Sequence, residues 1–138
     1  MSRSTDVLIV GAGPTGLMLA NQLARWGIRA TIIDRHPGPA EQTRAIGVHA
    51  RTLEIYAKLA IVERALESGK IASAANIWVA GRRRTRIPLG VMGEGISPYP
   101  FVLLLGQDDN EHPLAERLGH LGVNVAWRTE LIALEQKP

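Results

Sequence analysis

Apolar and polar positions along residues 1–34 predict a strand, a helix and a second strand. Residues 6–10 form a short apolar run rich in β-branched side chains, which is typical of a buried strand. Residues 14–26 place apolar side chains at helical spacing on one face, and Gly27 is suited to the C-terminal end of that helix. Residues 29–34 form the second strand. Two strands joined by a helix make a βαβ unit, so we expect them to lie parallel.

The pattern beyond residue 34 predicts further helices and strands between irregular segments. Helical spacing predicts helices over 50–59, 62–68 and 110–120. Strand patterns predict a hairpin over 71–89 that turns near Gly81, a buried strand over 101–106, and final strands over 123–127 and 130–134. Prolines and glycines make 36–44 and 88–100 irregular. We therefore predict one α/β domain over 1–138, with a Rossmann-like βαβ core, a parallel sheet, and a hairpin and irregular insertion over 71–100.

Three glycines, Gly11, Gly13 and Gly16, lie where the first predicted strand passes into the helix. Gly11 permits the tight turn, Gly13 lets a pyrophosphate approach the backbone, and Gly16 lets the helix pack closely on the strand. The start of the helix then offers unpaired N–H groups and the positive end of its dipole to the phosphates. The sequence therefore predicts a dinucleotide site, with Pro14 and Thr15 among its cofactor-binding residues.

An acid closes the second predicted strand. Asp34 lies at the tip of this strand, where its carboxylate can accept hydrogen bonds from a ribose diol. This acid favours a ribose with a free 2′-hydroxyl because it would repel a 2′-phosphate, although neighbouring Arg35 could soften the repulsion. FAD and NAD both carry such a ribose, so the glycines and the acid leave both cofactors open. A glycine-rich turn that binds no ligand is the remaining alternative.

The amino-acid composition limits which cellular compartments and which partners are expected. The chain is 46% hydrophobic and 21% charged, which is ordinary for a soluble globular protein, and no apolar stretch approaches the roughly 20 residues that a membrane helix needs. The absence of cysteine excludes disulfides and thiolate metal sites and fits the cytoplasm. A net charge of +3 could suggest nucleic acid, but it is more than accounted for by one cluster, which we interpret as a solvated hairpin: Arg82, Arg83, Arg84 and Arg86.

Two more segments follow the glycine turn: TRAIGVHARTLEIYAKLAIVERAL, residues 43–66, and LLLGQDDNEHPLAERLGHLGVNVAWRTEL, residues 103–131. In this order, the three motifs resemble the FAD-dependent aromatic hydroxylases, the single-component flavoprotein monooxygenases that include phenol and p-hydroxybenzoate hydroxylases and polyketide-tailoring hydroxylases. The resemblance runs from about Val7 to Leu131. It implies FAD as the bound cofactor, NAD(P)H as a transient reductant, and hydroxylation of a small aromatic substrate by O₂ through a flavin hydroperoxide.

The resemblance also implies a role for each matching residue. The three glycines would hold the FAD pyrophosphate, Asp34 would bind the adenosine ribose, and Arg35 would lie along the adenosine half. Arg44, in an Arg-Ala-x-Gly pattern, would reach the phosphates or the flavin side, and a loop position would let it fold over an anion. Gln107, after the LLLG segment, would hydrogen-bond the ribityl chain or the flavin edge. The alternatives are an exposed loop charge for Arg44 and a helix-capping residue for Gln107.

Several parts of the family pattern are missing. An Asp-Gly motif and a Gly-Asp motif lie later in the family, and neither dipeptide occurs in this chain. We therefore expect the amino-terminal portion of a hydroxylase, with little or no hydroxylation by this chain alone, and with the missing carboxy-terminal portion or a second copy as candidate partners. No catalytic residue and no metal site is identified in the sequence. The histidines lack metal-ligand spacing and are interpreted as structural or solvated: His36, His49, His112 and His120.

Three other functions stay open. The chain could belong to another FAD enzyme on the same scaffold, such as an epoxidase, a halogenase or a reductase. It could be a non-catalytic or truncated FAD-binding module. It could also be the NAD-binding domain of a dehydrogenase, although the motifs at 43–66 and 103–131 favour the aromatic hydroxylases.

Overall fold

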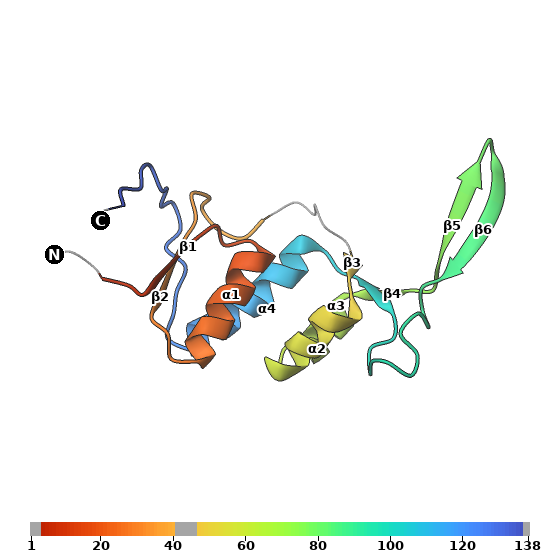
Figure 1. The fold of residues 1–138 in the computed structure, drawn as a ribbon, viewed down its shortest axis with the longest axis horizontal. Coiled ribbons are helices and arrows are strands. Elements are labelled where there is room, and N and C mark those ends of the chain that lie inside the picture. The colour runs from red at the N-terminus through yellow and green to blue at the C-terminus, as the bar shows by residue number, and fades with distance from the viewer. Residues whose placement is uncertain (1–3, 41–46, 137–138) are drawn as a thin grey trace. The chain divides into compact units, whose positions relative to one another are not determined.

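The structure is a computed structural model that describes residues 4–40 and 47–136 (Figure 1). The chain divides into two compact units. The first contains residues 1–42 and 110–138, and the second contains residues 43–109. None of the helices within the described ranges is long and apolar enough to cross a membrane.

The first unit contains the predicted βαβ arrangement. Strand β1 (Val7–Val10) is followed by helix α1 (Pro14–Arg25) and strand β2 (Ala30–Ile33). The two strands pair in parallel, in a register that runs from Val7 opposite Ala30 to Val10 opposite Ile33. The prediction of a parallel pair joined by a helix is therefore confirmed.

Helix α1 lies beside the second helix of the unit, α4 (Gln107–His120) (Figure 1). Buried residues from both helices, both strands and the glycine turn make up the core of the unit: Ile9, Ala12, Leu17, Ala20, Ile32, Ile33, Leu114 and Leu118. Asn21, also fully buried, joins the helices because its Nδ2 donates to the carbonyl oxygens of Leu17 and Leu114, each at 2.9 Å. Gly27 follows the end of α1, as predicted, and its backbone has the left-handed conformation with φ of 69°.

The start of α4 differs from the sequence prediction. The helix begins at Gln107 rather than Asn110, and Pro113 lies inside it. Asp108 and Asp109 occupy its first turn, where carboxylates interact favourably with the helix dipole.

The strands predicted over 123–127 and 130–134 have different outcomes in the structure. Ala126 forms a parallel bridge with Ile33, and its N–H donates to the carbonyl oxygen of Ile32 at 2.9 Å. The predicted strand over 123–127 is thus reduced to a single bridge, which places Ala126 beside β2 on a parallel path. The strand predicted over 130–134 is wrong, since these residues form no ladder within the described parts of the chain and Ile132 is 92% exposed. An alternating apolar pattern becomes a strand only where a neighbouring strand can accept its hydrogen bonds.

The second unit combines two helices with a small antiparallel sheet. Helices α2 (Ala50–Lys58) and α3 (Val62–Ser68) confirm two of the helix predictions. The sheet has the order β3-β7-β4, formed by Gly47–Val48, Val102–Leu104 and Lys70–Ala72. Its buried core comprises Val48, Leu53, Tyr56, Leu59, Ile61, Val62, Ala65, Ala72, Leu103 and Leu105.

The predicted hairpin over 71–89 is divided in the structure. Residues 70–72 pair with β7 as β4, and the hairpin itself consists of β5 (Ala74–Val79) and β6 (Arg82–Pro88), which turn at Ala80 and Gly81 (Figure 1). Sequence periodicity does not reveal where a strand changes partners, because the alternation continues across the change. All of β6 is exposed, including its four arginines, as expected for a solvated hairpin.

Candidate functional site

The turn between β1 and α1 is tied to the end of β2. Gly11 has a φ of 106°, a value that L side chains rarely adopt, and its N–H donates to the carbonyl oxygen of Ile33 at 2.8 Å. The next N–H, that of Ala12, donates to Asp34 Oδ2 at 2.7 Å. The glycine turn and the acid at the tip of β2 are thereby joined directly, as the parallel pairing of the two strands requires.

Gly16 lies where α1 passes closest to the turn. A Cβ built on Gly16 would overlap the carbonyl oxygen of Gly11, and it would lie 3.1 Å from the carbonyl carbon of Gly11 and 3.4 Å from Ile9 Cγ2. The helix therefore approaches the strand too closely for any other residue at this position. This geometry matches the packing role predicted for the third glycine.

Gly13 is the N-cap of α1, and the backbone beside it is open. Within the described ranges, a Cβ built on Gly13 would find a single neighbour within 4 Å, Glu111 Oε1 at 3.9 Å. Because glycine has no side chain, the N-cap residue makes no side-chain hydrogen bond to the N–H groups of the first turn. An anionic group can thus reach the start of a 12-residue helix, where free N–H groups and the helix dipole favour negative charge. The glycine turn fits a pyrophosphate.

Asp34 has most of its carboxylate occupied by protein donors. Oδ2 accepts the Ala12 N–H, while Oδ1 lies 2.8 Å from the backbone nitrogen of His36 and 2.8 Å from His36 Nδ1. Burial raises the pKa of the Asp34 carboxyl, but the hydrogen bonds from Ala12 and His36 outweigh burial, so the pKa lies below its usual range. Asp34 is therefore ionised at neutral pH and available as an acceptor.

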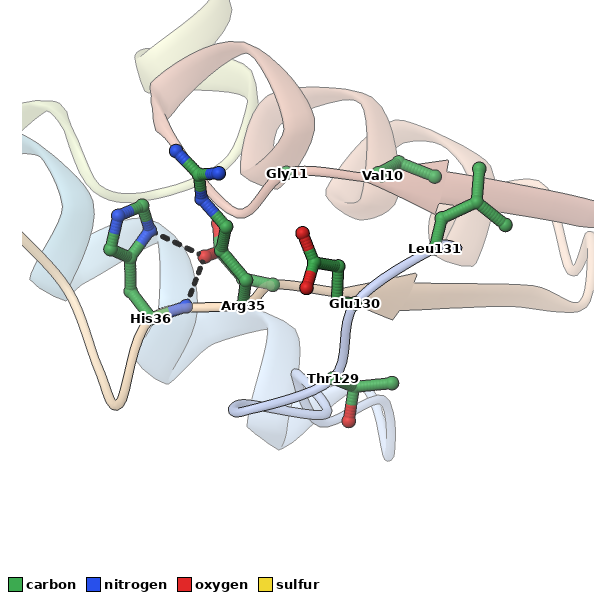
Figure 2. A pocket seen from close by; sticks show the side chains of 8 residues that line it. Val10, Gly11, Arg35, His36, Thr129, Glu130 and Leu131 are labelled. Atoms are coloured by element: carbon green, nitrogen blue, oxygen red, sulfur yellow. Dashed lines mark hydrogen bonds and ion pairs between the residues drawn. The ribbon is translucent and has the colours of Figure 1, made fainter. Parts of the chain in front are cut away.

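A hollow of about 320 Å³ opens at this end of the sheet. Figure 2 shows the side chains that line it; the two dashed lines from His36 mark its hydrogen bonds to Oδ1 of Asp34, which is not labelled. The lining comes from the end of β1, the residues after β2 and the segment after Trp127: Val10, Gly11, Asp34, Arg35, His36, Thr129, Glu130 and Leu131. The backbone of this last segment is held in place, since the N–H of Thr129 donates to the carbonyl oxygen of Asp34 at 2.9 Å. The hollow combines apolar walls with charges of both signs.

The structure brings most of the predicted site residues together. Gly11, Asp34 and Arg35 line the hollow, and residues 13–16, which include Pro14 and Thr15, form the adjacent start of α1. Arg44 lies outside the described residues. Gln107 is the first residue of α4 and belongs to the second unit. The predicted roles of these residues toward a cofactor stay predictions.

Two residues near the site were missed by sequence reasoning. His36 was interpreted as structural or solvated, yet it supplies two contacts to Asp34; an Asp followed two residues later by a donor is a common local turn and was the available signal. Glu111 is 2% exposed and its Oε2 accepts the N–H of Ala40 at 2.7 Å. No local pattern identifies Glu111, because its partner is distant in the sequence.

Comparison with known proteins agrees with this geometry. Residues 4–138 match the family described as FAD binding domain. The chain is 40% identical over 126 residues to 6-methylpretetramide 4-monooxygenase from Streptomyces rimosus, an alignment that covers 91% of this chain and 22% of that protein. The chain thus spans about a quarter of the length of the curated relatives it matches.

Solved structures show the same fold. The ternary complex of aklavinone-11 hydroxylase with FAD and aklavinone is similar with a TM-score of 0.84 and 25% identity, over 100% of this chain and 28% of that one. The p-nitrophenol 4-monooxygenase from Pseudomonas putida DLL-E4 is similar with a TM-score of 0.88 and 22% identity, over 99% of this chain and 35% of that one.

Proposed function

Because the chain belongs to the family of FAD-binding domains found in flavin-dependent monooxygenases, we propose that it holds FAD as the amino-terminal part of an NAD(P)H-dependent aromatic-ring hydroxylase. In this proposal residues 1–138 form the FAD-binding domain, and residues 71–100 are an insertion within it. One observation carries the proposal. The open backbone at Gly13 and the ionised carboxylate of Asp34 lie at the same end of the parallel strands, joined through Ala12.

Each group at the site has a binding role in this proposal. The first turn of α1, from Gly13 through Gly16, takes the pyrophosphate at its N–H groups, and Gly11 provides the turn that exposes them. Asp34 accepts hydrogen bonds from the adenosine ribose, and Arg35 lies along the adenosine half. Arg44 and Gln107 are proposed as further FAD contacts on the strength of the family resemblance alone.

The bound flavin would supply the redox chemistry, in which NAD(P)H is the reductant and O₂ the oxidant. The described residues of this chain hold and orient the nucleotide half of the cofactor, and the proposal assigns none of them a proton transfer. The substrate proposed for the whole enzyme is a small aromatic molecule, as the names of the relatives indicate for those proteins. We further propose a cytoplasmic location, since the chain has no cysteine, and pairing with a carboxy-terminal portion or a second copy.

A glycine substitution tests the proposal directly. Gly13 has φ of −71° and ψ of −179°, which alanine adopts freely, and the new Cβ would make only an ordinary contact with Glu111. Gly13→Ala should therefore fold normally but obstruct the pyrophosphate. Because a hydrogen bond to a charged group contributes about 1.5–3 kcal/mol, losing one should weaken FAD binding roughly 10- to 150-fold.

Gly38→Ala is the matched control, because a Cβ at Gly38 has no atom of the described residues within 4 Å. FAD affinity is measured by titration of flavin fluorescence, and retention of flavin absorbance is checked after gel filtration. Equal affinities for the parent chain and Gly13→Ala would contradict the proposed pyrophosphate site. Saturable binding of NAD without any binding of FAD would favour the NAD-binding domain of a dehydrogenase instead.

A further inference from the structure

The carboxylate of Asp34 has little room left for a ribose. A carboxylate offers about four lone-pair positions, two on each oxygen. Oδ1 faces two donors, the backbone N–H and the Nδ1 of His36, and Oδ2 accepts one hydrogen bond from Ala12. Among the described residues, both positions on Oδ1 are therefore taken and one position on Oδ2 remains.

A ribose diol needs more than this remaining position. Its two hydroxyls are held best when each donates to a different carboxylate oxygen, as in other bidentate contacts. Oδ2 can accept one of the hydroxyls, but Oδ1 must lose a donor before it can accept the other. One of the present partners of Asp34 must therefore move when a ribose is gripped in this way.

Only one of the three donors can leave at low cost. The Ala12 N–H belongs to the turn that starts α1, and the backbone of Asp34 and His36 is tied to the segment after Ala126 by hydrogen bonds from Arg128 to His36 and from Thr129 to Asp34, each 2.9 Å long. The His36 side chain, in contrast, is 64% exposed, whereas that of Asp34 is 12% exposed. The imidazole can rotate toward water without disturbing the backbone.

We propose that the His36 imidazole occupies on Asp34 the position that a ribose hydroxyl takes in the complex, so that His36 competes with the adenosine ribose and sets the affinity for the nucleotide. This inference rests on the proposed function, because it takes the ligand of the hollow to be a dinucleotide with a free ribose diol. His36 is a residue that determines affinity and not a catalytic residue.

Two substitutions at His36 test the competition. His36→Ala removes the competing donor and should bind FAD about three- to tenfold more tightly than the parent chain, as expected for the loss of one competing hydrogen bond. His36→Asn keeps a side-chain amide that can donate to Asp34, so its affinity for FAD should stay close to that of the parent chain. His120→Ala, at the exposed end of α4, is the control and should keep the affinity of the parent chain.

The measurement is the dissociation constant of FAD for the four proteins, followed by flavin fluorescence. Tighter binding by His36→Ala, with His36→Asn and His120→Ala close to the parent chain, supports the inference. Weaker binding by His36→Ala would overturn it, because the ring would then support the carboxylate instead of competing for it. Equal affinities of His36→Ala and the parent chain would also overturn it, while leaving the proposed function intact. Absence of FAD binding in all four proteins would overturn the proposed function together with this inference.

Discussion

Replacing Gly16 by alanine tests the close approach of α1 to the turn. The added Cβ would overlap the carbonyl oxygen of Gly11 and press on its carbonyl carbon at 3.1 Å. These are backbone atoms of a turn held by the hydrogen bond from Gly11 to Ile33, so they cannot rotate away as a flexible side chain would. Helix α1 must therefore shift relative to β1, and the packing of Leu17 and Ala20 in the core must shift with it.

The expected magnitude follows from two opposing effects. Overpacking in a well-packed region costs about 1–3 kcal/mol, and rigid backbone neighbours favour the upper end. Alanine in a helix interior is more favourable than glycine by about 1 kcal/mol, which offsets part of this cost. The free energy of unfolding should therefore fall by about 2 kcal/mol. Without the steric overlap, Gly16→Ala would instead stabilise the protein, so the sign of the change decides between the two cases.

Urea denaturation followed by far-ultraviolet circular dichroism measures the change. With a denaturant slope of about 2 kcal/mol per molar, the midpoint of Gly16→Ala should fall by about 1 M. Gly38→Ala is the control: it also restricts the unfolded chain, but its Cβ meets no neighbour in the part of the chain that the structure describes, so its midpoint should stay unchanged or rise slightly. A midpoint for Gly16→Ala at or above that of the parent chain would refute the reasoning, since it would mean that α1 does not depend on glycine here.

Two further predictions concern polar groups in the first unit. Asn21→Ala should lower the free energy of unfolding by about 1–3 kcal/mol, because it removes two buried hydrogen bonds to Leu17 and Leu114; urea denaturation should show a much smaller change for the partly exposed Gln22→Ala. Asp34→Asn should destabilise the chain near neutral pH and much less in acid. The reason is that the lowered pKa of Asp34 makes its charged form stabilising above the unfolded-state value of about 3.9, and this stabilisation is lost as the pH falls through the lower folded value. A stability difference that stayed constant down to about pH 3 would contradict the role given to the carboxylate.

Local patterns in the sequence determined the elements and much of the site. The βαβ unit was predictable because the spacing of apolar residues and the position of Gly27 reflect only local geometry. The turn at Gly11 and the close packing at Gly16 were predictable for the same reason, since a strand that enters a helix directly needs a positive φ at the first position and space at the second. Asp34 followed from its place at the end of β2, because parallel strands end at the same edge of a sheet.

Only the tertiary structure decided which partners these elements and side chains have. The segment 130–134 carries a strand pattern yet forms no strand, and residues 70–72 leave the predicted hairpin to pair with β7. The buried carboxylate of Glu111 accepts a hydrogen bond from the N–H of Ala40. The carboxylate of Asp34 accepts hydrogen bonds from Ala12 and His36. Periodicity records which face of an element is apolar, whereas hydrogen-bond partners depend on segments that are far apart in the chain and meet only on folding.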